Sequence, residues 1–185
     1  MPFAGLDRAL PLRAPQQACY VMLAEGRYSS EGQIFTQEVR KRLPKAEVAT
    51  LDPTMTREAM DDAVRKLPGC ESYAVAAFSS VAANRGTIGL SGELPQVVQT
   101  LTASGKPLVL IALGNPYLLR SFPDVPAYLA TFSTATSSET AAVRALFGEI
   151  NITGHLPVSI PPVAQYGEGI QVQATRAVTI SGQSQ

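Results

Sequence analysis

The stretch KPLVLIAL, residues 106–113, is the strongest strand signal in the sequence. It is a short continuous apolar run that follows Gly105 and is followed by the turn residues Gly114-Asn115-Pro116. A strand that is apolar along its whole length is typical of a parallel sheet, in which helices cover both faces. The stretch therefore predicts a buried strand of such a sheet.

Apolar runs of strand length alternate with stretches of helical period on both sides of this stretch. Further strands are predicted at residues 19–24, 47–51, 72–81 and 127–133. A late edge strand is predicted at LPVSI, residues 156–160, because Pro157 is tolerated only at a sheet edge. The alternation predicts an α/β fold: a three-layer sandwich with a mainly parallel sheet of about six strands and helices on both faces.

The predicted organisation has three parts. Residues 1–17 form a linker through which the chain enters the domain, residues 18–161 form the α/β sandwich, and residues 162–185 form a polar C-terminal tail. Residues 1–15 have no apolar signal core, so no secretory peptide is expected there. The sequence leaves the compartment open.

The charge pattern argues against nucleic acid as a partner, and the length of the apolar runs argues against a membrane. Lys plus Arg and Asp plus Glu number 15 each, without a basic stripe, so nucleic acid is not an expected partner. No apolar run approaches the roughly 20 residues of a membrane-spanning helix, so no membrane contact is expected.

Two cysteines and one histidine limit thiol and metal chemistry. Cys19 and Cys70 are too few for a disulfide framework, and both lie beside apolar runs, so two buried thiols are predicted. With His155 as the single histidine, a zinc site of His and Cys ligands is not expected. No G-x-G-x-x-G or Walker-type loop occurs either, so we predict neither a metal nor a cofactor.

The motifs for nucleophilic catalysis are incomplete. Gly89-Leu90-Ser91-Gly92-Glu93 lacks the last glycine of a nucleophile elbow. Cys70 precedes its predicted strand, which is wrong for a nucleophile exposed at a turn. His155 lies in a turn before the predicted edge strand, where a surface position is expected.

Four carboxylates are candidates for acid–base work: Glu25, Glu93, Asp124 and Glu139. Glu139 also completes a capping-box pattern with Thr136, and a second such pattern joins Ser30 to Gln33. In a capping box, both side chains satisfy backbone N–H groups at the start of their own helix. The capping role is predicted for Glu139, and the sequence by itself predicts no active site.

Four segments, in order, carry a resemblance to a known family. They are RALPL at 8–12, GKPLVLIALGNPY at 105–117, SETAAVRALFGE at 138–149 and ITGHLPV at 152–158. Together they resemble the C-terminal (α/β)6 sandwich domain of family 3 glycoside hydrolases, over nearly the whole chain. The resemblance implies that an N-terminal (β/α)8 barrel, absent from this chain, carries the aspartate nucleophile.

The family has two branches that differ in where the acid/base lies. In the β-glucosidase branch, the sandwich domain lends a glutamate a few residues before an Asp-Arg pair. Here the segment Val81-Ala82-Ala83-Asn84-Arg85 has no Glu, and Asn84 stands in place of the Asp. In the β-N-acetylhexosaminidase branch, an Asp/His dyad on a barrel loop supplies the proton. The resemblance therefore implies the second branch, and no catalytic residue carries over to this chain.

The resemblance implies an accessory, non-catalytic domain of a retaining glycoside hydrolase that acts on β-N-acetylglucosaminides. Its partners would be the (β/α)8 barrel and, through the parent enzyme, the carbohydrate substrate. We expect four loop residues to face the barrel or the substrate: Arg85, Asn115, Tyr117 and Arg120. Arg120 has an alternative partner in Asp124.

Other interpretations stay open. One is a stand-alone α/β domain that binds a sugar or a protein, and another is an independent hydrolase that uses Cys70 or His155. Without its barrel, the chain is expected to form a weak homodimer through the loops around Arg85 and Tyr117, because a net charge near zero gives little repulsion.

Overall fold

The computed structural model describes residues 9–79 and 89–175 of the 185-residue chain. The described strands form one sheet in the order β2-β1-β3-β4-β5, and every neighbouring pair is parallel. They are β1 (Ala18–Leu23), β2 (Val48–Leu51), β3 (Ser72–Ser79), β4 (Leu108–Gly114) and β5 (Ala127–Ala130). The predicted α/β fold class is confirmed.

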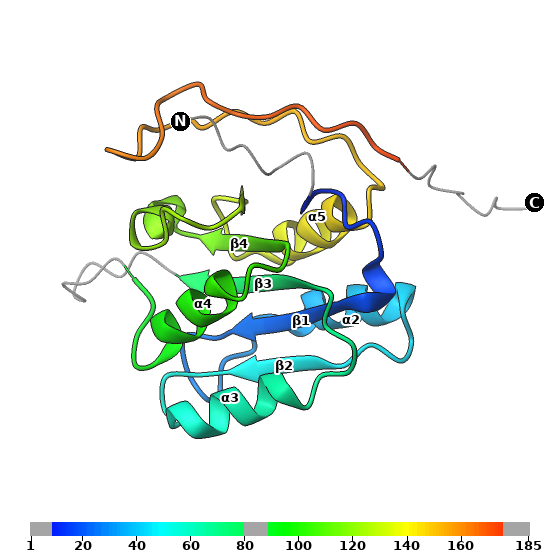
Figure 1. The fold of residues 1–185 in the computed structure, drawn as a ribbon. Coiled ribbons are helices and arrows are strands. Elements are labelled where there is room, and N and C mark those ends of the chain that lie inside the picture. The colour runs from blue at the N-terminus through cyan, green and yellow to red at the C-terminus, as the bar shows by residue number, and fades with distance from the viewer. Residues whose placement is uncertain (1–8, 80–88, 176–185) are drawn as a thin grey trace, which may run out of the picture.

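Helices cover both faces of this sheet (Figure 1). The α-helices are α2 (Gln33–Arg42), α3 (Arg57–Arg65), α4 (Leu94–Ala103) and α5 (Thr136–Leu146). Two short 3-10 helices, η1 (Pro15–Gln17) and η2 (Pro116–Ser121), complete the described helices. One apolar cluster joins the sheet to α3, α4 and η2, and a second joins its other face to α2 and α5. The molecule therefore has three layers.

Residues 108–113 of the stretch KPLVLIAL lie in β4, so a buried strand forms here as predicted. Leu108 and Leu110 belong to the cluster under α3 and α4, whereas Val109 and Ile111 belong to the cluster under α2 and α5. All four side chains are fully buried. Successive side chains of a strand point to opposite faces, so a strand buried on both faces must be apolar throughout.

Cys19 and Cys70 form a disulfide, with their Cα atoms 5.1 Å apart. The prediction of two buried thiols is therefore wrong. Cys19 lies in β1 and Cys70 lies just before β3, and these two strands are parallel neighbours that begin at the paired residues Ala18 and Ser72. The sheet order, which the spacing of the cysteines does not reveal, brings their sulfur atoms together.

The end of α5 is attached to the end of α2 by an arginine. The Arg42 guanidinium donates to Glu149 at 2.6 Å and to Glu38 at 2.7 Å, and it lies over the Phe147 ring. These carboxylates raise the pKa of Arg42 above its ordinary value, with the hydrogen bond to Glu149 as the largest cause. Phe147 also stacks on Tyr20 of β1, at 6.4 Å between ring centroids. The LFGE segment at 146–149 thus joins α5 to α2 and to the sheet.

Residues 148–175, which we call the C-terminal arm, double back on themselves beyond β5 (Figure 1). Ile152 and Val172 exchange two backbone hydrogen bonds, at 2.8 and 3.0 Å. The Leu156 N–H donates to the backbone carbonyl of Glu168 at 2.7 Å, and the Leu156 carbonyl accepts from the Gly167 N–H at 2.8 Å. The predicted edge strand at 156–160 is therefore wrong, because this segment bonds to the returning arm instead of to the sheet.

Candidate functional site

In an open parallel sheet, ligands bind outside the carboxyl ends of the strands, and the predicted site residues follow those ends. Asn115 directly follows β4, and its Oδ1 accepts a hydrogen bond of 2.9 Å from the Tyr117 N–H. Its own N–H donates to the Ser79 carbonyl at 2.9 Å. Asn115 is 1% exposed, so its side chain faces inward and caps η2.

The other predicted loop residues are placed differently. Tyr117 is half-buried against the α3–α4 cluster, and Arg120 is exposed on the same short helix. Arg85 lies outside the described residues. The structure thus places Asn115, Tyr117 and Arg120 on one segment, and their orientation toward a barrel stays a prediction.

Glu139 has a structural role that differs from the predicted one. Its carboxylate accepts a hydrogen bond of 2.7 Å from the Phe35 N–H, in the first turn of α2. The N-cap of its own helix is Ala135, which makes no side-chain cap bond. The predicted capping box between Thr136 and Glu139 is wrong, because the neighbouring helix offers Glu139 free N–H donors.

The second predicted capping box is also wrong. The helix begins at Gln33, directly after Gly32, which has a φ of 78°. No side chain makes a cap hydrogen bond at this helix start, so Ser30 does not cap it. A Cβ at Gly32 would lie 1.5 Å from the Sδ of Met22. The chain therefore enters α2 through a left-handed glycine, a conformation that other residues rarely adopt.

Burial is the largest cause that raises the pKa of Glu139. The Phe35 N–H opposes this effect, and the nearby Glu31 carboxylate adds to it. Glu31 itself accepts a hydrogen bond of 2.8 Å from the Ser29 hydroxyl. Two carboxylates thus lie near the start of α2, and Glu139 is the one sealed from solvent.

His155 is exposed on the C-terminal arm, as predicted. Its Nδ1 lies 3.0 Å from the Gly167 carbonyl, and its Nε2 lies 3.2 Å from Nε2 of Gln171. A ring that donates from Nδ1 and accepts at Nε2 satisfies both contacts. The ring therefore connects the two passes of the arm.

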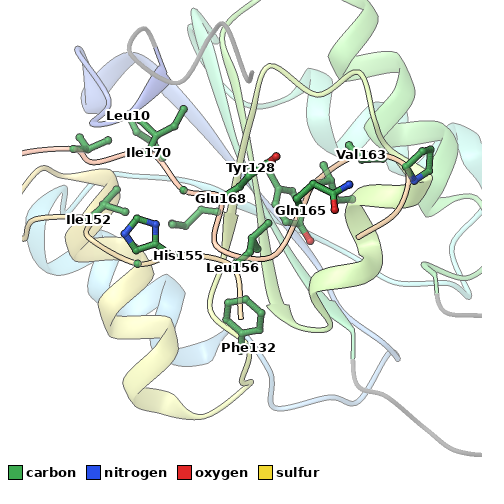
Figure 2. Close-up of a pocket in the computed structure, with 17 residues that line it drawn as sticks. Leu10, Tyr128, Phe132, Ile152, His155, Leu156, Val163, Gln165, Glu168 and Ile170 are labelled. Atoms are coloured by element: carbon green, nitrogen blue, oxygen red, sulfur yellow. The ribbon is translucent and has the colours of Figure 1, made fainter. Parts of the chain in front are cut away.

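A pocket of about 680 Å³ lies between β5 and the C-terminal arm (Figure 2). Tyr128, Leu129 and Ala130 of β5 line one side. The arm supplies most of the other side, and its apolar lining side chains include Ile152, Leu156, Val163, Ile170 and Val172. Sequence reasoning missed this pocket, because it exists only when the arm folds back over the edge of the sheet.

Within residues 9–79 and 89–175, no group of three or more His, Cys, Asp or Glu side chains is arranged to hold a metal ion. In the same part of the chain, no helix is both long and apolar enough to span a bilayer.

The model of the glycosyl hydrolase family 3 C-terminal domain matches residues 7–181 of the chain. Among curated proteins, the periplasmic beta-glucosidase of Salmonella typhimurium is 30% identical over 122 residues. The matched region covers 62% of this chain and 16% of that protein.

Solved structures show the same fold. A fungal multi-domain family 3 beta-N-acetylglucosaminidase is similar with a TM-score of 0.67 at 24% identity, over 88% of this chain and 18% of that chain. A family 3 beta-N-acetylglucosaminidase from Paenibacillus sp. str. FPU-7 is similar with a TM-score of 0.55 at 15% identity, over 77% of this chain and 27% of that chain. The chain thus spans less than a third of each of these relatives.

Proposed function

Because the chain belongs to the glycosyl hydrolase family 3 C-terminal domain family, we propose that it is the accessory, non-catalytic domain of a retaining glycoside hydrolase. The match over residues 7–181 carries this proposal, since it includes all the described strands and helices as well as the C-terminal arm. The catalytic residues would lie on the (β/α)8 barrel of the parent enzyme. This domain would cover one side of that barrel and shape the sugar cleft.

The roles of two polar side chains support an accessory domain. Glu139 satisfies backbone N–H groups of α2, and Asn115 caps η2. Both side chains are buried, at 3% and 1% exposure. A polar group that is enclosed and already bonded holds the fold together and is poorly placed to transfer a proton to a sugar.

For the substrate, we propose β-N-acetylglucosaminides. The support comes from residues 81–85, which have no glutamate, and from Asn84, which stands where the β-glucosidase branch has an aspartate. The barrel would then supply both catalytic groups. The curated relative is a beta-glucosidase, so β-glucosides are the comparison substrate for the experiment.

The disulfide supports an exported parent enzyme. Disulfides persist in the periplasm and outside the cell and are rare in the cytosol. Cys19 and Cys70 are joined between two neighbouring strands, and the curated relative is named a periplasmic protein. An oxidising compartment would keep this bond formed.

The test is complementation in trans. The parent barrel would be produced without this domain, and kcat/KM would be measured before and after addition of the 185-residue chain. We expect the chain alone to turn over neither 4-nitrophenyl N-acetyl-β-glucosaminide nor 4-nitrophenyl β-glucoside. We expect its addition to raise kcat/KM of the barrel for the N-acetylglucosaminide.

Two results would contradict the proposal. Turnover by the chain alone, lost in Glu139→Gln or His155→Ala, would assign catalysis to this domain. Sugar binding by the chain without any effect on the barrel would favour a stand-alone binding domain. A larger gain for the β-glucoside would correct the substrate and leave the accessory role in place.

A further inference from the structure

The C-terminal arm is attached to both faces of the sheet. Ile160 and Ala164 are buried in the apolar cluster under α3, α4 and η2. Ile152 and Ile170 pack against the opposite cluster, under α2 and α5. Between these attachments the arm crosses the edge of the sheet, so it forms an arch over β5 that is fixed at both ends.

The pocket lies under this arch. Its lining includes Leu10 from the α2–α5 cluster and Leu119 from the α3–α4 cluster, so it extends across the sheet edge from one layer to the other. In Figure 2, Leu10 and Ile170 lie on one side of Tyr128, and Val163 lies on the other. A volume of about 680 Å³ is within the range of pockets that hold a ligand.

The strand at the floor of the pocket has one unpaired edge. β5 pairs with β4, and no described strand pairs with its other side. An unpaired strand edge presents a row of backbone N–H and C=O groups that can pair with another extended chain. An occupant that matches this pocket therefore offers backbone hydrogen bonds to β5 and apolar side chains to the walls.

A sugar and a second copy of this chain match the pocket less well. The polar side chains of the lining are His155, Gln165, Glu168 and the hydroxyl of Tyr128. The Tyr128 hydroxyl donates to Pro116, and both ring nitrogens of His155 have partners in the arm, which leaves few groups for a sugar. A second copy matches less well, because its own arm lies over its β5 edge and would have to move before the two edges could pair.

We propose that the groove between β5 and the C-terminal arm binds an extended segment of the parent polypeptide, which adds as a further strand to the sheet. The chain spans 16% to 27% of its relatives, so most of each relative's polypeptide lies outside the matched domain. This inference rests on the proposed function, because the docked segment comes from the same enzyme. The groove would fix the domain to the barrel independently of the loops near the sugar.

The test uses a fluorescein-labelled peptide, acetyl-TVTVTV-amide, and fluorescence anisotropy with the 185-residue chain. We expect saturable binding to the chain. N-methylation of alternate residues removes N–H donors while it keeps the apolar side chains, and we expect it to weaken binding about tenfold or more. Ile170→Trp would fill the groove and abolish binding. Tyr166→Ala is the matched control on the same arm, because Tyr166 is 74% exposed and does not line the pocket.

Equal binding of the plain and the N-methylated peptide would overturn the proposal, since apolar contact alone would then explain it. Absence of saturable binding up to millimolar peptide would overturn it as well. Concentration-dependent dimerisation that Ile170→Trp abolishes would identify a second copy as the occupant. If the wild-type chain and Ile170→Trp raised kcat/KM of the barrel equally, the proposed role of the groove would be rejected and the proposed function would stand.

Discussion

The carboxylate of Glu139 in α5 accepts a 2.7 Å hydrogen bond from the backbone N–H of Phe35, in the first turn of α2. The first N–H groups of a helix have no partner within that helix, so Glu139 acts for α2 as an N-cap side chain would. At the other end of α2, Arg42 bonds to Glu149 just beyond α5. The two helices are thus joined by polar contacts at both ends, with apolar packing between them.

Glu139→Ala should lower the free energy of unfolding by about 1–3 kcal/mol, because it leaves buried N–H groups of α2 without an acceptor. Thr136→Ala, in the first turn of α5, is the matched control and should change it by less than about 0.5 kcal/mol, because Thr136 does not cap its helix. Urea denaturation of the three proteins measures both changes. Equal losses in the free energy of unfolding for Glu139→Ala and Thr136→Ala would support a capping box between the two residues.

The pH dependence of stability should differ in sign between Glu139 and Glu38. Burial raises the pKa of Glu139 above 4.5, so its contribution to stability is present below pH 4.5 and is lost as the pH rises through the raised value. Hydrogen bonds from Lys41 and Arg42 lower the pKa of Glu38, so its contribution is present above pH 4.5 and is lost as the pH falls through the lowered value.

The measurement is urea denaturation of the wild type, Glu139→Gln and Glu38→Gln between pH 3 and pH 7. From pH 4.5 upward, the wild type should lose stability relative to Glu139→Gln. Below pH 4.5, it should lose stability relative to Glu38→Gln. If the difference in free energy of unfolding between the wild type and each variant changed with pH in the same direction, Glu139 would not be held in a desolvated site.

Reduction of the disulfide should lower the free energy of unfolding by about 2–4 kcal/mol, because the bond closes a long loop in the unfolded chain. The readout is urea denaturation with and without dithiothreitol. The double variant Cys19→Ala/Cys70→Ala serves as control and should be insensitive to the reductant. A wild type that is equally insensitive would mean that the two sulfur atoms are not bonded in solution.

Glu149→Gln should destabilise the protein by about 1–2 kcal/mol, because it removes a charged partner of the partly buried Arg42. Lys66→Ala is the control for an exposed ion pair, with Asp62, and should change the stability by less than about 1 kcal/mol. Thermal denaturation at low and high salt measures both changes, and salt should reduce the effect of Lys66→Ala more because its ion pair is exposed. A larger effect for Lys66 would contradict the role given to Glu149.

The sequence predicts the sheet well because each central strand is buried on both faces and must be apolar along its length. Residues 106–113 show this directly, because the predicted strand starts two residues before the observed start of β4 at Leu108. The prediction of an edge strand at 156–160 fails because its apolar residues pack on a core cluster while its backbone hydrogen-bonds to the returning arm. The pattern of a short apolar run does not reveal which segment its backbone hydrogen-bonds to.

The polar contacts were predicted less well for a related reason. The pattern Thr136-x-x-Glu139 describes neighbours in sequence, whereas the partner of Glu139 is Phe35, in a helix that packs alongside. Cys19 and Cys70 likewise meet only because β1 and β3 are adjacent. Such contacts depend on the order of the strands and helices in space, which one sequence with local patterns does not give.

The arch over β5 has a consequence for synthesis on the ribosome. Translation delivers the chain from the N-terminus, so the five strands of the described sheet leave the ribosome before Ile160 and Ala164, which attach the arm. During that interval the β5 edge of a nascent chain is uncovered. Unpaired strand edges on incomplete domains are where neighbouring nascent chains associate, so a pause in translation between residues 131 and 164 would expose this protein to aggregation.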